Sequence, residues 1–281
     1  MYPENLGEHL SIDETSLSHG ELYTIVTNKA AKGKKGAIVA IVAGTKAETV
    51  IKVLQEIPER QRLKVSEITL DMAGNMELIS KRCFRNAVRV TDRFHVQKLA
   101  TEALQEMRIK YRWEALDAEN AAIDKARKAK TSFKAELLPN GDTLKQLLAR
   151  ARYVLYKKPT DWTDNQKERA ALLFELYPSL KQAFELSMGL SNIFEKTTDK
   201  LYGLARLAKW HEKVRQCEFK SFNTISRSIQ HHYQTILNYF DNRSTNASAE
   251  SFNAKIKAFR SQFRGVRNIE FFLFRLTELY A

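Results

Sequence analysis

The sequence predicts an α/β fold, with a mixed sheet early in the chain and helices over most of the remainder. Up to about residue 91, runs rich in β-branched residues alternate with runs of helical periodicity. Residues 97–240 hold many helical patterns and no convincing strand. Residues 241–281 then return to an amphipathic helix with an aromatic stripe.

The elements of the first part follow from local patterns. The run 36–44 is apolar throughout, as expected of a strand buried on both faces. The run 45–56 has the apolar spacing of an amphipathic helix, and Pro58 ends it. A second helix is expected over 74–83. The predicted strands are residues 10–15, 21–27, 36–44, 65–71 and 87–91.

Three strands, a helix, a strand, a helix and a strand, in this order, are expected of a ribonuclease H-like core. In that core the first strand lies beside the fourth, so Asp13 and Asp71 should meet. Two ionised carboxylates side by side repel, and either protonation or a divalent cation must relieve the repulsion. Local alternatives remain open: Asp13 can begin a turn, and Asp71 can cap the following helix.

The C-terminal helix carries a third acid. At about 3.6 residues per turn, the polar face holds one acid among amide and basic side chains, and an aromatic stripe holds the helix in place. This arrangement suits an enzyme that places a metal against a phosphodiester, although a solvated amphipathic helix is the alternative. The polar face comprises Glu250, Asn253, Lys257, Arg260 and Arg264, and the stripe comprises Phe252, Ile256, Phe259 and Phe263.

The amino-acid composition limits the classes of binding partner that the chain can have. The 281 residues carry a net charge of +13 with an isoelectric point near 9.6, and most of the excess lies after residue 100, so nucleic acid is a plausible partner. No apolar run is long enough to span a membrane, and no secretory signal begins the chain. Cys83 and Cys217 have no ligand spacing. We therefore expect no membrane association, and a cytoplasmic, nucleoid-associated protein.

The sequence resembles the ISL3-type insertion-sequence transposases, which are DDE recombinases, from about residue 8 to residue 279. Two short aspartate segments, 12–14 and 70–72, contribute to the resemblance. Two longer segments are more specific: Thr91-Asp92-Arg93-Phe94-His95-Val96, and residues 246–257, which hold Glu250.

The resemblance implies a catalytic triad of Asp13, Asp71 and Glu250 that binds two Mg²⁺ ions, with Mn²⁺ as a substitute. It implies DNA cleavage at transposon ends and strand transfer into target DNA by a homo-oligomer. The long interval before Glu250 implies a helical insertion over residues 97–240 between two parts of the catalytic core, 1–96 and 241–281.

The resemblance also implies weaker roles for other residues. Asn253, Lys257, Arg260 and Arg264 would hold phosphates on the DNA. His95 either lies near the cleft, where it would contact DNA, or is structural. Asp92 is a competing carboxylate that suits the N-cap of a helix better than a metal ligand.

The chain departs from the family pattern at its start, because only 12 residues precede Asp13 and no DNA-recognition region lies among them. A separately encoded DNA-binding protein would then supply end recognition, or the chain is a truncated remnant. Rival interpretations are a nuclease on the same scaffold without strand transfer, a catalytically inactive DNA-binding protein, and a regulator that forms mixed oligomers.

Overall fold

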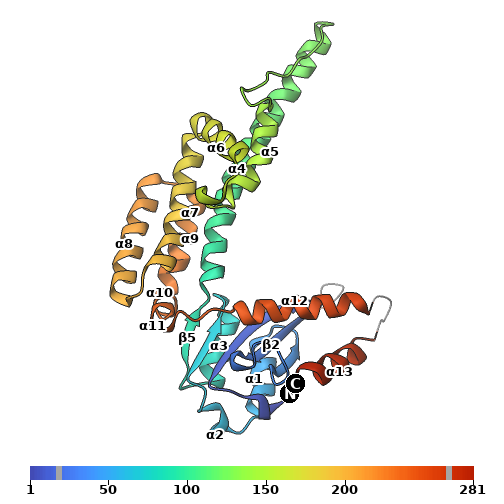
Figure 1. The fold of residues 1–281 in the computed structure, drawn as a ribbon, viewed down its shortest axis with the longest axis vertical. Helices are drawn as coiled ribbons and strands as arrows, with labels where there is room; N and C mark the ends of the chain where they lie inside the picture. Colours follow the sequence, from blue (N-terminus) through green and yellow to red (C-terminus); the bar gives the residue numbers. More distant parts are fainter. Residues whose placement is uncertain (17–20, 264–267) are drawn as a thin grey trace. The chain divides into compact units, whose positions relative to one another are not determined.

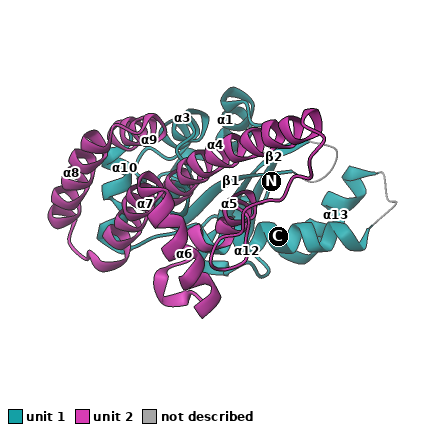
Figure 2. Cartoon of the chain, turned by 90° about the horizontal axis from the view of Figure 1, so that it is seen from above, with its two compact units in different colours: residues 1–95, 232–281 teal, residues 96–231 magenta. Residues whose placement is uncertain are grey.

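A computed structural model of the chain describes residues 1–16, 21–263 and 268–281. The chain divides into two compact units, one formed by residues 1–95 and 232–281 and the other by residues 96–231, coloured separately in Figure 2. The first unit contains a five-stranded mixed sheet together with helices from both ends of the chain.

The sheet has the order β3-β2-β1-β4-β5, and Figure 1 labels two of its strands, β2 and β5. β1 pairs antiparallel with β2 and parallel with β4, which confirms the prediction that the first strand lies beside the fourth. In this register Asp13 is opposite Ile25, and Ser11 is opposite Thr69. The strands are β1 (His9–Ser16), β2 (Leu22–Asn28), β3 (Ile38–Ala43), β4 (Glu67–Leu70) and β5 (Val88–Thr91).

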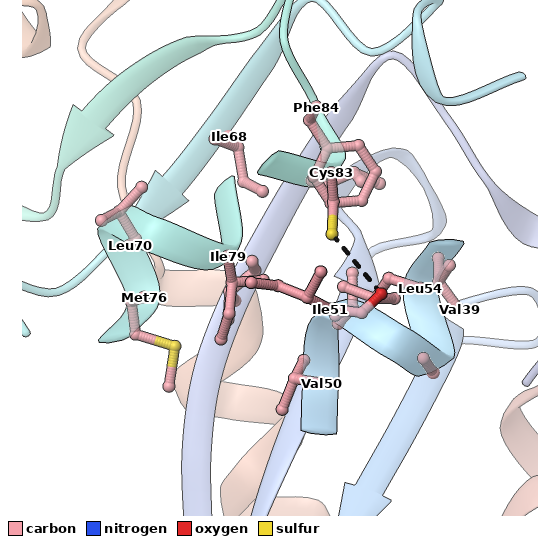
Figure 3. Packing of buried hydrophobic residues seen from close by; sticks show 14 of the residues in the cluster. Val39, Val50, Ile51, Leu54, Ile68, Leu70, Met76, Ile79, Cys83 and Phe84 are labelled. Atoms are coloured by element: carbon pink, nitrogen blue, oxygen red, sulfur yellow. Dashed lines mark hydrogen bonds between the residues drawn. The ribbon is translucent and has the colours of Figure 1, made fainter. Parts of the chain in front are cut away.

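One face of the sheet is covered by α1 (Ala47–Gln55) and α3 (Gly74–Cys83), and α3 has the bounds expected from the sequence. Alternation along β1 turns Leu10 and Ile12 to this side, where both are fully buried. Figure 3 shows side chains of α1, β4 and α3 meeting in this apolar core, including Leu54, Ile68 and Ile79. The layer is the main hydrophobic core of the unit.

Cys83 lies inside this core. Burial raises the pKa of its thiol to about 11, so the thiol stays protonated at neutral pH, and its Sγ lies 3.9 Å from the carbonyl oxygen of Ile51. The short helix α2 (Glu59–Arg62) was not expected from the sequence. It carries a buried arginine, Arg62, which donates hydrogen bonds to the carbonyls of Ile57 and Cys83.

The other face of the sheet is covered by α12 (Ala247–Gln262) and α13 (Ile269–Tyr280). Phe252 and Ile256 of α12 are buried against Tyr23 and Ile25 of β2, and Phe272 of α13 joins the same cluster. Two segments from opposite ends of the sequence therefore share one core.

Two short helices, α10 (Tyr233–Leu237) and α11 (Tyr239–Asn242), belong to the first unit, although the sequence analysis includes most of this stretch in the helical segment 97–240. Asn238 donates its side-chain amide to the carbonyl of Arg89, and the hydroxyls of Thr235 and Thr91 lie 2.7 Å apart. These contacts tie the stretch to β5.

The unit of residues 96–231 is formed by helices alone. Trp210 is buried and donates its indole N–H to the carbonyl of Leu186, whereas the side chain of Trp113 is 61% exposed. No helix in the described part of the chain is long and apolar enough to cross a bilayer. The unit contains most of α4 (Arg93–Lys128), then α5 (Leu144–Leu155), α6 (Asp164–Leu176), α7 (Pro178–Lys196), α8 (Lys200–Cys217) and α9 (Lys220–His231).

Candidate functional site

Asp13 lies within β1 rather than in a turn. Because side chains alternate along a strand, Asp13 shares a face with Ser11 and points away from the core that contains Ile12. Its cross-strand partner Ile25 packs in the cluster beneath α12. The strand therefore presents Asp13 on the face that α12 covers.

Asp71 follows the last residue of β4, the parallel neighbour of β1. Its Oδ1 accepts a hydrogen bond from the backbone N–H of Ala73 at 2.9 Å, immediately before α3 begins. Asp71 therefore forms a local turn before α3 and does not cap it, because the N-cap residue is Ala73 and has no side-chain cap bond; the charge of Asp71 also acts on Asp13.

Helix α12 is fixed over Asp13 by polar contacts as well as by its aromatic stripe. Ser11 Oγ donates to Oδ1 of Asn246, a fully buried residue at the start of α12, at 2.8 Å. Asn253 Nδ2 donates to Asp13 Oδ2 at 2.6 Å. Glu250 lies between these two anchors along the helix, in its first turn.

Burial raises the pKa of two acids at this site, and the charges of neighbouring acids add to the increase. Burial raises the pKa of Asp13, and the charges of Asp71 and Asp92 add to the increase, while the N–H of Glu14 and the charge of His95 oppose it. Burial also raises the pKa of Glu250, again with contributions from Asp92 and Asp13. Both carboxyl groups therefore hold their protons to a higher pH than free side chains do.

No arginine or lysine in the described part of the chain forms an ion pair with Asp13, Asp71, Asp92 or Glu250. By contrast, the buried acid Glu67 of β4 has a cationic partner, Lys29, whose Nζ lies 3.3 Å from Oε1. The acids around Glu250 therefore have no lysine or arginine counterion among the described residues, and the basic group whose charge acts on them is His95.

Three of these groups come closest together. Asp92, His95 and Glu250 each offer one ligand atom, and these atoms lie within 4.8 Å of one another. Asp92 precedes α4, and its Oδ1 accepts a hydrogen bond from the N–H of Phe94 at 3.2 Å, as expected of a helix cap. Asp13 does not belong to this set of three, although its charge acts on Glu250.

The basic residues predicted to hold DNA differ in their surroundings. Lys257 is exposed on α12. The guanidinium of Arg260 lies over the ring of Phe272, 5.1 Å from its centroid. Arg264 lies outside the described residues.

Comparison with known proteins decides the family. The profile of the ISL3-type DDE transposases, described as "Transposase", matches residues 10–276, nearly the whole chain. The chain belongs to the ISL3-type transposase family. This confirms the resemblance found in the sequence.

Two curated relatives of this ISL3-type chain carry the name "Transposase for insertion sequence element IS1557". Both come from Mycobacterium tuberculosis, one from strain CDC 1551 / Oshkosh and one from strain ATCC 25618 / H37Rv. Each is 25% identical over 250 residues, which is 88% of this chain and 54% of the relative. The chain therefore spans about half the length of the curated relatives it matches.

In this ISL3-type chain, the local sequence patterns do not indicate that Asp92 and Glu250 lie together. The available signal was the spacing of Asp92 and His95, which puts them on one side of a first helical turn. The meeting of that turn with α12 is a long-range contact that local patterns do not encode. Five polar groups, namely Asp13, Asp71, Asp92, His95 and Glu250, thus form one electrostatically connected site.

Proposed function

We propose that this ISL3-type chain is a metal-dependent DNA transposase, which cleaves phosphodiesters at insertion-sequence ends and transfers the freed strand into target DNA. The observation that carries the proposal is that acids from distant parts of the sequence act on one another, the charge of Asp71 on Asp13 and the charge of Asp13 on Glu250, with no lysine or arginine counterion among the described residues. The family match supports the same activity.

The fold supports the proposal at the level of architecture. We propose that the first unit is a ribonuclease H-like core, because its sheet has three antiparallel strands followed by two parallel ones, with β1 beside β4. Residues 96–231 would then be a helical insertion between β5 and the helix that carries Glu250.

The carboxylate groups of Asp13, Asp71 and Glu250 are suitable ligands for divalent cations. Asp13 and Glu250 are buried enough for their pKa values to rise, and a bound cation would remove the repulsion that contributes to this increase. Asp13, Asp71 and Glu250 would hold two Mg²⁺ ions, with Mn²⁺ as a substitute. Bound Mg²⁺ would supply activation of the attacking oxygen and stabilisation of the leaving oxygen.

The protein's own residues hold this arrangement in place. Asn253 fixes one oxygen of Asp13 through its amide, and the N–H of Ala73 fixes one oxygen of Asp71. Both carboxylates are therefore oriented before substrate arrives, which reduces the cost of reorganisation during the reaction.

DNA is the proposed substrate and partner. Lys257, exposed on the helix that carries Glu250, would contact phosphates near the scissile bond. Arg260 and Asn253 follow along the same helix, and His95 and Arg264 complete the set of proposed DNA contacts. Because the chain spans about half of its curated relatives, recognition of element ends is proposed to need a further DNA-binding segment or protein, and the active form a homo-oligomer on DNA.

The test is cleavage of labelled element-end DNA by the purified chain in Mg²⁺, with and without a supplied end-binding segment. Glu250→Gln and Asp71→Asn should lower cleavage at least about a hundredfold, because each removes a charged ligand worth several kcal/mol in the transition state. Thr160→Ala, an exposed substitution in the helical unit, is the control.

Strand-transfer products from the wild type separate a transposase from a nuclease. Cleavage without joined products would favour a nuclease on the same scaffold. DNA binding with no cleavage under any metal condition would favour an inactive DNA-binding protein.

A further inference from the structure

Asp92 has a buried carboxylate oxygen without a hydrogen-bond partner among the described residues. Its side chain is 1% exposed, and the oxygen concerned is Oδ2, while Oδ1 accepts from Phe94. A buried acceptor without a partner costs about 1–3 kcal/mol, and more when it is charged. Buried polar groups of this kind call for a partner such as an ion.

His95 and Glu250 lie where that partner would bind. The ligand atoms of Asp92, His95 and Glu250 are mutually within 4.8 Å. Neighbouring ligand atoms bonded to one ion at about 2.0–2.2 Å lie about 3.0–3.5 Å apart, so side-chain movements that draw the three atoms together around an ion would complete the coordination.

The backbone positions these ligands on two helix starts. Asp92 and His95 flank the first residues of α4, and Glu250 is in the first turn of α12. The partial positive charge of a helix N-terminus stabilises ionised carboxylates, which is the form that binds a cation.

We infer that Asp92, His95 and Glu250 hold one divalent cation through two carboxylates and one imidazole nitrogen. This ligand set differs from the triad by including a nitrogen donor. Mg²⁺ prefers oxygen ligands, whereas imidazole suits Zn²⁺, Cu²⁺, Fe²⁺ and Ni²⁺ better, so the site selects a transition-metal ion over Mg²⁺, with Mn²⁺ the weakest binder among the transition metals. The inference rests on the proposed function for the role of the ion, but not for its binding.

The inference reassigns two residues. His95 becomes a metal ligand rather than a contact to DNA, and Asp92 becomes both the cap of α4 and a ligand. Glu250 is then shared between this cation and the one nearer Asp13, whose charge already acts on it.

The experiment uses the full chain freed of metal by a chelator and then loaded with Mn²⁺. Electron spin-echo modulation of the bound Mn²⁺ detects a directly bonded ¹⁴N nucleus, and a titration that follows free Mn²⁺ gives the affinity. The wild type should show nitrogen modulation that disappears in His95→Gln. His9→Gln, which changes an exposed histidine at the start of β1, should leave the modulation intact.

Affinity provides the second readout. His95→Gln and Asp92→Asn should each weaken Mn²⁺ binding at least about tenfold, since even outer-shell partners of metal ligands are worth 10–100-fold. His95→Gln should weaken Mg²⁺ binding less than Mn²⁺ binding. Unchanged thermal unfolding of the metal-free variants shows that any loss is local.

Bound Mn²⁺ without nitrogen modulation in the wild type, modulation that survives His95→Gln, or no binding up to millimolar Mn²⁺ would overturn the inference. The assay needs no DNA, so it fails independently of the proposed function. Nitrogen-ligated Mn²⁺ in a chain that does not cleave DNA would leave the inference standing and reject the function. Cleavage by a chain without nitrogen-ligated metal would support the proposed function and reject the inference.

Discussion

The two faces of the five-stranded sheet differ in the kind of side chain that they bury. On the face covered by α1 and α3, apolar side chains such as Ile12, Ile68 and Leu70 are buried against other apolar side chains. On the face covered by α12 and α13, apolar residues of β2 and β3 lie beside the polar side chains of β1 and β4, including Ser11, Asp13 and Glu67.

The difference separates stability from function within one sheet. On the first face, burial of apolar surface contributes about 25 cal/mol per Å² to the stability of the fold, and this contribution does not depend on which apolar side chain is the neighbour. Buried polar groups on the second face cost stability unless each finds its partner. Glu67 is bonded to Lys29 and Asn242, whereas the hydrogen bonds that Asp13 accepts from described residues come from the amide of Asn253 and the N–H of Glu14. The candidate site is therefore the place where buried acids lack a lysine or arginine partner among the described residues.

The largest effect on stability should come from the apolar face. Ile79→Ala in α3 removes a fully buried side chain and should lower the free energy of unfolding by about 2–5 kcal/mol. Urea denaturation measures the loss. Mn²⁺ affinity of the folded variant should stay unchanged; a large change in affinity would mean that the two faces are coupled and the comparison is wrong.

A smaller loss is expected from the anchor of α12. Asn246→Ala leaves the buried hydroxyl of Ser11 without its acceptor and should cost about 1–3 kcal/mol. Because this bond holds the start of α12 on β1, hydrogen exchange of α12 amides should accelerate more than that of α3. Equal acceleration in both helices would indicate a global effect rather than loss of a local anchor.

Replacing Asp13, a buried acid without a lysine or arginine partner among the described residues, should stabilise the metal-free protein. The folded-state pKa of Asp13 is raised, so its contribution to stability is full below the unfolded pKa of about 3.9 and is lost as pH rises through the folded pKa. Asp13→Asn removes this loss and should increase the free energy of unfolding at pH 7 by on the order of 1 kcal/mol, with no gain at pH 3. Denaturation in chelator at several pH values measures it.

Glu67→Gln is the control, because it should change the free energy of unfolding at pH 7 in the opposite direction. Burial alone would raise the pKa of Glu67, but hydrogen bonds from Ser244, Asn242 and Lys29 outweigh it and lower the pKa. Its contribution is therefore present above the unfolded pKa of about 4.3 and is lost as pH falls through the folded pKa. Glu67→Gln should destabilise at pH 7, and the same sign for both variants would contradict the distinction between buried acids with and without a lysine or arginine partner among the described residues.

The smallest effect concerns DNA. Lys257→Ala on α12 should weaken duplex binding by about 1 kcal/mol or less, to a similar extent for all sequences, and reduce the slope of log affinity against log salt by about 1. Lys52→Ala, an exposed lysine on α1 over the apolar face, is the matched control and should change neither quantity. Equal losses from both lysines would mean that DNA does not prefer the face of α12.

Local patterns were enough to predict much of the first unit. The β-branched residues of β2 and the apolar spacing of α1 depend on neighbouring residues, so the order of elements was predictable. That order, expected of a ribonuclease H-like core, in turn predicted the adjacency of β1 and β4. The helix α2 was missed because its four polar residues carry no periodic signal; a buried Arg62 that bonds to distant carbonyls holds it.

The sequence by itself determined that acids end or interrupt strands and that α12 has one aromatic and one polar face. The tertiary structure alone decided how these parts combine, bringing Glu250 beside Asp92 and His95, leaving Asp92 Oδ2 without a partner, and laying Arg260 over Phe272. The physical reason is that periodicity reports which face of an element is buried, whereas the partner of a buried polar group is set by the packing of segments that are far apart in the chain.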